Sequence, residues 1–324
     1  MEWIRKLKEK VLAGGQVSKE EALQLVDAPL EELTQAADEI RRKCSGDGFD
    51  LCTIVNGKCG RCSEDCKFCA QSAYYHTTCV ETYPLLSTEE LVEGAKHNEA
   101  QGVLRYSIVT SGKRLSDREV DRVCESIRAI RRETSLGVCV SFGLMNDDQF
   151  RRLKEAGASR VHCNLESSAR FFPSVCSTHT YQEKIETLKA AKRAGLSICS
   201  GGIMGLGETM EDRIDMVLTA RELGVKSVPV NLLNPIPGTP FAHNRVLSNE
   251  ELCRCVAIFR FLIPEGSIRL AGGRGLLGDK GEACFRSGAN AAISGDMLTT
   301  AGITTQTDQA LLKELGYVPR RYEG

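Results

Sequence analysis

Short apolar segments alternate with amphipathic segments along the chain from about residue 50 onward. The apolar segments have the length of buried strands, whereas the amphipathic segments have helical periodicity. Strands are predicted at 51–56, 104–111, 137–143, 160–167, 197–204, 227–233, 267–273 and 289–295. Strands that alternate with helices predict a parallel sheet, and eight of them predict a closed (β/α)8 barrel of the TIM type. An open, doubly wound sheet is the alternative.

Helix boundaries between the strands carry recognisable signals. A polar residue is followed three positions later by Glu or Gln, which is the pattern of a capping box. These pairs are Ser87 with Glu90, Ser116 with Glu119, Asn146 with Gln149, and Ser248 with Glu251. Gly157, Gly195 and Gly224 are expected to mark helix ends. Because the segment before the first strand also has a helical pattern, we expect an N-terminal helical extension (1–45) packed on a single barrel domain (46–324).

One face of the fourth predicted strand is polar. His162, Asn164 and Glu166 alternate with apolar residues and therefore share a face. This is unusual, because both faces of a parallel sheet are normally covered by apolar groups. Arg105 and Arg269 also fall within predicted strands, where an isolated buried charge is costly. Together these residues predict a polar barrel lumen that holds ligands.

The overall charge favours a small-molecule substrate. The chain has 42 basic and 43 acidic residues, a formal net charge of -1, so nucleic acid and anionic membranes are not expected as partners. No apolar run of about 18 residues occurs, and the N-terminal segment is amphipathic and lacks an apolar core. A cytoplasmic protein is therefore expected.

Four of the 15 cysteines lie in one short stretch, "NGKCGRCSEDCKFCAQSA", at 56–73. This cysteine loop follows the first strand, and in a barrel such loops converge on one mouth. Cys62, Cys66 and Cys69 supply three soft thiolates, which select zinc or an iron–sulfur cluster. Cys59 would complete a four-cysteine zinc site, and a redox pair of Cys59 with Cys62 is a third interpretation. The close spacing favours a cluster, and three ligands on four irons leave one iron open.

Several motifs together resemble biotin synthases, a family of the radical S-adenosylmethionine (SAM) superfamily. The CxxxCxxC motif follows the first strand, and Phe68 precedes its third cysteine. Six further blocks occur in the family's order between about residues 45 and 318, namely "CAQSAYYHT", "THTYQEK", "ICSGGIMGLGET", "VPVNLLNPIPGTP", "IRLAGGR" and "MLTTAG". The resemblance thus covers most of the chain.

The resemblance implies a mechanism and its partners. Cys62, Cys66 and Cys69 would hold a [4Fe-4S] cluster whose open iron binds SAM. An electron from this cluster breaks the sulfonium bond, and the resulting 5'-deoxyadenosyl radical takes hydrogen from dethiobiotin, twice for each biotin, while sulfur is inserted. An enclosed, water-poor lumen would confine this radical. The resemblance further implies a sulfur-transferring enzyme that works as a homodimer with an electron donor such as flavodoxin or ferredoxin.

The resemblance also implies roles for individual residues. Those expected at the cofactor are Phe68, Arg105, Asn164, Glu166, Lys184 and Ile203. Those expected at the substrate are Asn164, Asn231, Thr299 and Thr300. Glu166 would pair with Arg105, and the two threonines would receive the dethiobiotin carboxylate, although they could also simply form a loop or helix cap.

The sequence departs from the family at the second cluster. In the best-known members, three cysteines on separate strands and an arginine hold a [2Fe-2S] cluster that donates sulfur. Cys139, Cys199 and Arg269 match three of these positions, but Ser107 stands where the fourth residue is cysteine. A serine hydroxyl is a much poorer iron ligand than a thiolate. The cluster has therefore either been lost or been rebuilt with another ligand.

We expect a rebuilt auxiliary cluster, because Cys139, Cys199 and Arg269 have no evident purpose without one. Its expected ligands are Cys139, Cys176, Cys199 and Arg269, with Cys199 and Arg269 taking part in sulfur insertion. Cys176 follows the fourth strand and should lie at the mouth, whereas Cys163 is a second candidate on the opposite face of that strand. The nuclearity of the cluster is left open, and no role is assigned to Cys59 or Cys79.

Two other functions remain possible at this point. One is a different radical SAM enzyme, such as a hydrogenase-maturation or other carbon–sulfur enzyme. The other is a non-enzymatic protein stabilised by zinc or a cluster, for example a scaffold or electron carrier. "MLTTAG" and "VPVNLL" favour biotin synthase over the first, since another substrate has no reason to keep the carboxylate and ureido contacts. Metal analysis of protein purified without oxygen would separate the second.

Overall fold

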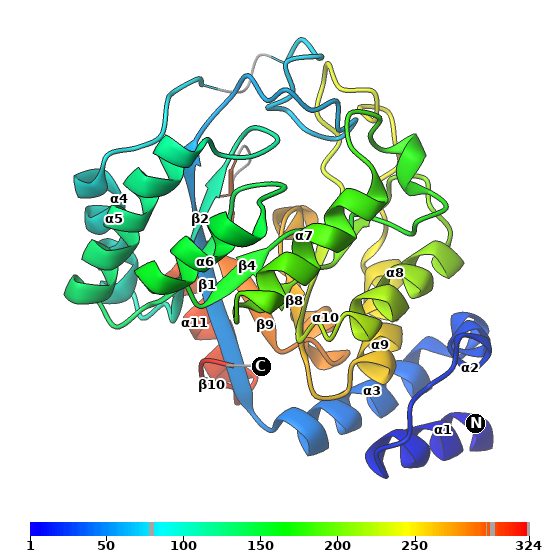
Figure 1. Ribbon diagram of the computed structural model, residues 1–324. Coiled ribbons are helices and arrows are strands. Elements are labelled where there is room, and N and C mark those ends of the chain that lie inside the picture. Colours follow the sequence, from blue (N-terminus) through cyan, green and yellow to red (C-terminus); the bar gives the residue numbers. More distant parts are fainter. Residues whose placement is uncertain (78–80, 296, 299–301, 323–324) are drawn as a thin grey trace.

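A closed parallel barrel forms the centre of the molecule (Figure 1). The computed structural model describes residues 1–77, 81–295, 297–298 and 302–322. Neighbouring strands pair in the order β1-β2-β3-β4-β5-β7-β8-β9, and β9 pairs back to β1. The strands are β1 (Gly48–Lys58), β2 (Arg105–Thr110), β3 (Gly137–Ser141), β4 (Arg160–His162), β5 (Ser197–Cys199), β6 (Gly202–Met204), β7 (Ser227–Leu232), β8 (Ser267–Leu270), β9 (Ala291–Ser294) and β10 (Val318–Pro319). The predicted (β/α)8 barrel of the TIM type is confirmed.

Two predicted strands differ most clearly from the structure. The predicted strand at 197–204 is divided into β5 and β6, which both pair with β7. The interruption falls at Gly201, whose N–H donates to the Asn164 side chain at 3.1 Å and so leaves the strand ladder. The predicted strand at 160–167 ends as β4 at His162. Backbone bonds continue beyond it, because the Glu166 N–H donates to the Gly201 carbonyl at 3.1 Å.

Helices follow the strands and surround the barrel. They are α4 (Thr88–Ala100), α5 (Asp117–Glu133), α6 (Asp147–Ala156), α7 (Tyr181–Arg193), α8 (Met210–Glu222), α9 (Asn249–Leu262), α10 (Glu282–Arg286) and α11 (Thr305–Glu314), with 3-10 turns at Leu25–Asp27, Phe172–Ser174 and Arg274–Leu276. All four predicted capping boxes are confirmed at the starts of α4, α5, α6 and α9. Gly157 ends α6 in the left-handed conformation, as predicted. Among the described residues, no helix combines the length and apolarity needed to cross a membrane.

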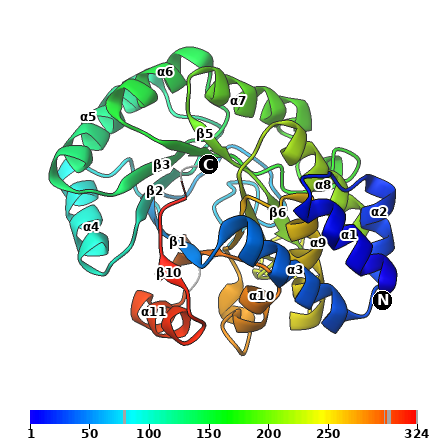
Figure 2. The same ribbon diagram turned by 90° about the horizontal axis from the view of Figure 1, so that it is seen from below.

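Three helices precede the barrel and pack on its outside. They are α1 (Glu2–Leu12), α2 (Lys19–Gln24) and α3 (Leu30–Ser45). α3 packs against α9 and α2 against α8, on one side of the ring of strands (Figure 2). The division of the chain into an extension (1–45) and one barrel domain (46–324) stays a prediction.

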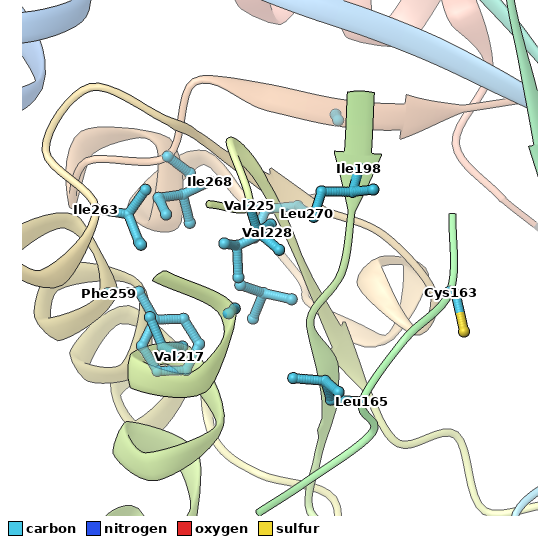
Figure 3. Packing of buried hydrophobic residues seen from close by; sticks show 14 of the residues in the cluster. Cys163, Leu165, Ile198, Val217, Val225, Val228, Phe259, Ile263, Ile268 and Leu270 are labelled. Atoms are coloured by element: carbon cyan, nitrogen blue, oxygen red, sulfur yellow. The ribbon is translucent and has the colours of Figure 1, made fainter. Parts of the chain in front are cut away.

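The main apolar core lies between the strands and the outer helices. Figure 3 shows Val228 and Ile268 of the strands together with Val217 of α8 and Phe259 of α9, all of them buried. These strand residues point outward, so the alternating positions point into the barrel. In many such barrels the interior is packed with branched apolar residues. Here the inward positions carry thiols, hydroxyls and charges, as the polar face at 160–166 predicted.

Candidate functional site

The barrel lumen encloses a cavity of about 330 Å³. Its wall is formed by inward-facing residues of the strands and by side chains near the mouth. The polar wall residues are Cys52, Arg105, Ser107, Cys139, Ser141, Arg160, His162, Asn164, Glu166, Cys199, Asn231 and Arg269, and the larger apolar ones include Phe68, Ile203, Ile293, Met297 and Leu298. The structure therefore brings most of the predicted site residues to one cavity.

One end of the lumen is a buried charge cluster, which we call the charged base. Asp50 lies 2.9 Å from Arg105, 3.3 Å from Arg269 and 3.6 Å from Arg160. All four side chains are at least 96% shielded from solvent. Burial opposes ionisation of Asp50, but the guanidinium groups of Arg269, Arg105 and Arg160 hold the pKa of this carboxyl below its usual range. Three buried guanidinium groups therefore surround the Asp50 carboxylate.

The predicted pair of Arg105 with Glu166 is wrong. Arg105 begins β2, at the amino end of the barrel, and its guanidinium binds the Asp50 carboxylate and the Tyr322 carbonyl. Glu166 lies beyond the carboxyl end of β4. The two residues therefore lie toward opposite ends of the lumen, and Arg105 belongs to the charged base.

Three thiols line the lumen together with the charged base, and we call Cys52, Cys139 and Cys199 the deep thiols. The Cys52 thiol donates to the Thr53 carbonyl at 3.3 Å, and the Cys199 thiol donates to Ser227 Oγ at 3.3 Å. Arg269 Nη2 is buried and makes no hydrogen bond within the described part of the chain. Cys139, Cys199 and Arg269 are thus brought together, as expected.

Cys52 was missed by the sequence interpretation. It lies two residues after Asp50 on β1, so strand alternation places both side chains in the lumen. That alternation was the available signal, but no family motif pointed to this position.

Cys176 does not join the deep thiols, so the expected ligand set is corrected. The Cys176 thiol donates to Asp65 Oδ1 at 3.1 Å and lies 3.3 Å from His179 Nδ1. Its sulfur also groups with Cys66, with the donor atoms of Cys66, Cys176 and His179 all within 4.8 Å of one another. The cause is the loop after β4, which turns back onto the cysteine loop, where the Lys67 N–H donates to the Val175 carbonyl at 3.0 Å.

The cysteine loop follows β1 at the carboxyl end of the barrel, at the top of Figure 1. Backbone bonds close it, because Cys62 N–H donates to Gln71 O and Ala73 N–H donates to Cys62 O, both at 2.8 Å. Cys62, Cys66 and Cys69 are half-buried. Cys59 is buried and held in a backbone bridge with Tyr83. Three soft thiols are thus presented by one loop while the fourth is withdrawn, which fits a cluster with three protein ligands better than a four-thiolate zinc site.

A second cavity of about 170 Å³, which we call the upper chamber, lies between the cysteine loop and the lumen. Cys62 and Cys66 line it on the side of the loop, and Lys184 of α7 lines it with a buried side chain. Ser141, His162, Asn164 and Glu166 line both cavities. Because the two cavities are adjacent and share these lining residues, a ligand at the loop cysteines can reach the lumen.

Glu166 combines two unusual features at the shared wall. Its backbone has a φ of 70°, a left-handed conformation that costs about 1–3 kcal/mol for a residue other than glycine. Its Oε2 atom is shielded and has no hydrogen-bond partner among the described residues. Burial raises the pKa of this carboxyl, although Lys184 and His162 lie close enough to oppose the shift. An unsatisfied carboxylate oxygen beside the upper chamber fits a ligand that donates hydroxyl groups, such as a ribose.

Asn231 lines the lumen but is already engaged by the backbone. Its amide donates to the Gly202 carbonyl at 3.0 Å, and its oxygen accepts from the Gly272 N–H at 2.9 Å. One amide hydrogen remains for a ligand. Thr299 and Thr300 lie outside the described residues, although Met297 and Leu298 of the same segment reach the lumen.

Two family models match the chain. That of the radical SAM superfamily matches residues 58–220, and that of the biotin and thiamin synthesis associated domain matches residues 229–318. A relative from Corynebacterium diphtheriae named biotin synthase 2 is 58% identical over 314 residues, which cover 97% of this chain and 95% of the relative. The biotin synthase of Akkermansia muciniphila is 58% identical over 311 residues, which cover 96% and 97%.

Solved structures show the same fold at much lower identity. Methylornithine synthase superposes with a TM-score of 0.84 at 20% identity, covering 97% of both chains. The FeFe-hydrogenase maturase from Carboxydothermus hydrogenoformans superposes with a TM-score of 0.83 at 18% identity, covering 98% of this chain and 79% of the maturase. These likenesses concern the fold alone.

Proposed function

Since the chain belongs to the biotin synthase family of radical SAM enzymes, we propose that it converts dethiobiotin to biotin with an auxiliary iron–sulfur cluster as sulfur donor. The observation that carries this proposal is the arrangement of sulfur in one barrel. The cysteine loop lies at the mouth, the deep thiols lie with Arg269 at the base, and the two cavities between them share a wall. A substrate held in the lumen would therefore have a radical source on one side and a sulfur source on the other.

At the mouth, Cys62, Cys66 and Cys69 would hold a [4Fe-4S] cluster. With SAM bound, that cluster supplies the electron that generates a 5'-deoxyadenosyl radical. The protein's own contribution begins at the backbone, where the Gly112 N–H donates to the Cys62 sulfur at 3.3 Å and helps to orient it. Cys59 takes no part, because it is buried in a separate backbone bridge.

SAM would occupy the upper chamber. Lys184 is a buried ammonium there and suits the SAM carboxylate, while Glu166 Oε2 suits the ribose hydroxyls. Asn164 fixes the backbone next to this carboxylate by accepting from the Gly201 N–H. These contacts would orient SAM, and they do not require Arg105 to pair with Glu166.

Dethiobiotin would occupy the lumen. Phe68 and Ile203 provide apolar contact near the mouth, and Asn231 has one amide hydrogen left for the substrate. Thr299 and Thr300 would receive its carboxylate. The surrounding barrel wall would limit the access of water, which would protect a radical from side reactions.

An auxiliary cluster would lie at the deep thiols, with Cys199 and Arg269 beside the carbon atoms that receive sulfur. The charged base supports this placement, since an iron–sulfur cluster with thiolate ligands is an anion and would be attracted by the nearby guanidinium groups. The donor set also fits, because thiolates are the ligands that iron–sulfur clusters select.

The remaining partners follow from the same chemistry. We propose a cytoplasmic enzyme, because open iron–sulfur sites and unpaired thiols suit a reducing compartment. A flavodoxin or ferredoxin would deliver the electron, and two copies of the chain would form a homodimer. Light scattering of the purified protein tests the dimer, and reduction assays with each carrier test the donor.

The deciding experiment uses anaerobically reconstituted protein with SAM, dithionite and dethiobiotin. Biotin and 5'-deoxyadenosine are measured by mass spectrometry, with two molecules of the nucleoside expected for each biotin. Reconstitution with ³⁴S sulfide should place the label in biotin. Nucleoside production without biotin would indicate a different radical SAM enzyme, and unlabelled biotin would refute the auxiliary cluster as sulfur donor.

A further inference from the structure

The lumen carries a third thiol at a position that no family motif pointed to. Cys52 lies on β1, with Arg105 of β2 and Ile293 of β9 as its neighbours in the strand register. Its side chain is 6% exposed and lines the same cavity as Cys139 and Cys199. Cys139 lies on β3, two strands away from β1, and lines the same lumen.

Ser107 lies close to the Cys52 thiol but on the next strand. It pairs in register with Ile54 of β1 and with Cys139 of β3, it is 5% exposed, and it lines the lumen. The hydroxyl and the thiol therefore occupy neighbouring strands of one cavity wall. Because iron prefers thiolate to hydroxyl, a cluster in this cavity would select the thiol on β1.

Buried guanidinium groups lie next to the three thiols. Arg105, Arg160 and Arg269 share one carboxylate, Asp50. Arg269 Nη2 is buried, lies 3.3 Å from Asp50 Oδ2 and makes no hydrogen bond with a described residue. Such groups are costly in a protein interior unless something else satisfies them. Thiols that lose their protons to bind iron would place negative charge next to these guanidinium groups.

We propose that Cys52 is the third thiolate ligand of the auxiliary cluster, together with Cys139, Cys199 and Arg269. The third cysteine ligand would then lie on the first strand, where the best-known members have it on the second. Ser107 and Cys176 would not bind the cluster. This inference rests on the proposed function, because it assumes that an auxiliary cluster exists. It differs from that function in naming the residue that makes the cluster possible.

The test counts iron and sulfide and records Mössbauer spectra of anaerobically reconstituted protein. Four serine variants are compared with the unchanged protein: Cys52→Ser, Cys139→Ser, Cys176→Ser and Cys124→Ser. Cys124 is a matched control, because it is a buried thiol of α5 outside both cavities. Cys52→Ser and Cys139→Ser should each lose the whole iron and sulfide share of the second cluster. Cys176→Ser and Cys124→Ser should retain that share.

A double variant covers the case in which Cys52→Ser does not fold. Cys52→Ser with Ser107→Cys moves the thiol back to the second strand and should bind a second cluster. A folded double variant without that cluster would overturn the inference. The inference would also be overturned if Cys52→Ser has an unchanged iron content and an unchanged Mössbauer spectrum while Cys139→Ser loses the cluster.

Failure of the proposed function has a different signature. If the unchanged protein binds only the loop cluster and Cys139→Ser changes nothing, no auxiliary cluster exists, and the ligand assignment falls with it. If Cys176→Ser loses the second cluster while Cys52→Ser keeps it, the cluster exists but the ligand named here is wrong.

Discussion

Replacing Asp50 by Asn tests how strongly the Asp50 carboxylate stabilises the charged base. The substitution keeps the shape of the side chain but removes the carboxylate charge that three buried arginines share. Asp50 is 1% exposed, and its contacts to the guanidinium groups are 2.9 to 3.6 Å long. Solvent cannot replace the lost charge, so Asp50→Asn should destabilise the fold strongly.

The magnitude follows from the cost of an uncompensated buried charge. Removing one partner of a buried ion pair lowers the free energy of unfolding by about 3–5 kcal/mol. The unfolding entropy is about 2.1 cal/mol/K per residue, which gives about 0.7 kcal/mol/K for 324 residues. The melting temperature should therefore fall by about 4–7 °C in the protein without clusters. With an anionic cluster bound, the fall should be smaller, because the arginines then have a second counter-charge.

Differential scanning calorimetry of both variants under anaerobic conditions measures this effect. Glu186→Gln is the matched control, because Glu186 makes an exposed ion pair with Lys189 at 3.1 Å. Such a pair contributes about 0.5 kcal/mol, so the control should shift the melting temperature by less than about 1 °C. A shift for Asp50→Asn no larger than the control's would refute the reasoning about the charged base.

The pH dependence gives a second readout for Asp50. Its folded pKa lies below the unfolded value, so the carboxylate's contribution is complete above the unfolded pKa of about 3.9 and is lost as the pH falls through the folded pKa. Asp50→Asn removes this titration. The acid limb of its stability curve should therefore be flatter than that of the unchanged protein below about pH 4.

Three further predictions follow from the same site. Alanine at each of the three loop cysteines (Cys62, Cys66, Cys69) should abolish 5'-deoxyadenosine production from SAM, whereas Cys59→Ala should retain it; equal losses would contradict the three-ligand assignment. Glu166→Gln should weaken SAM binding by about tenfold, since a hydrogen bond to a charged group contributes about 1.5–3 kcal/mol. The melting temperature of the unliganded protein should stay unchanged or rise, because burial raises the pKa of the Glu166 carboxyl and so disfavours its charge. Calorimetric titration measures the affinity and thermal melting the stability, and an unchanged affinity would remove Glu166 from the SAM site. Deleting residues 320–324 should lower the free energy of unfolding by at least about 2 kcal/mol, because the Tyr322 carbonyl accepts from Arg105 and from Arg160; a denaturant titration with an unchanged midpoint would contradict this.

The architecture could be predicted from the sequence because local patterns specify it. Apolar segments of strand length, helices with capping boxes and their strict alternation leave few alternatives to a parallel barrel. The structure differs from that prediction mainly at Gly201, where a side-chain bond from Asn164 interrupts one strand. The cysteine loop could also be predicted, because its ligands lie close together in sequence and directly follow a strand.

Polar positions within strands were predictable for a related reason. Strand alternation assigns His162, Asn164 and Glu166 to one face without knowledge of the fold, and all three line the lumen. The same rule places Asp50 and Cys52 together on β1. It does not say which residues of other strands meet them.

Pairings across the lumen were decided by the tertiary structure alone. Arg105 binds Asp50 and not Glu166, because the height of each residue along the barrel depends on the strand register. Cys176 meets Cys66 and His179, because the path of the loop after β4 has no periodicity that a sequence pattern could reveal. Cys52, on a regular strand, lines the lumen with Cys139, where Cys176 was expected. Periodic backbone geometry makes side-chain direction a local property of a strand, whereas the partner that a side chain meets depends on how distant segments pack.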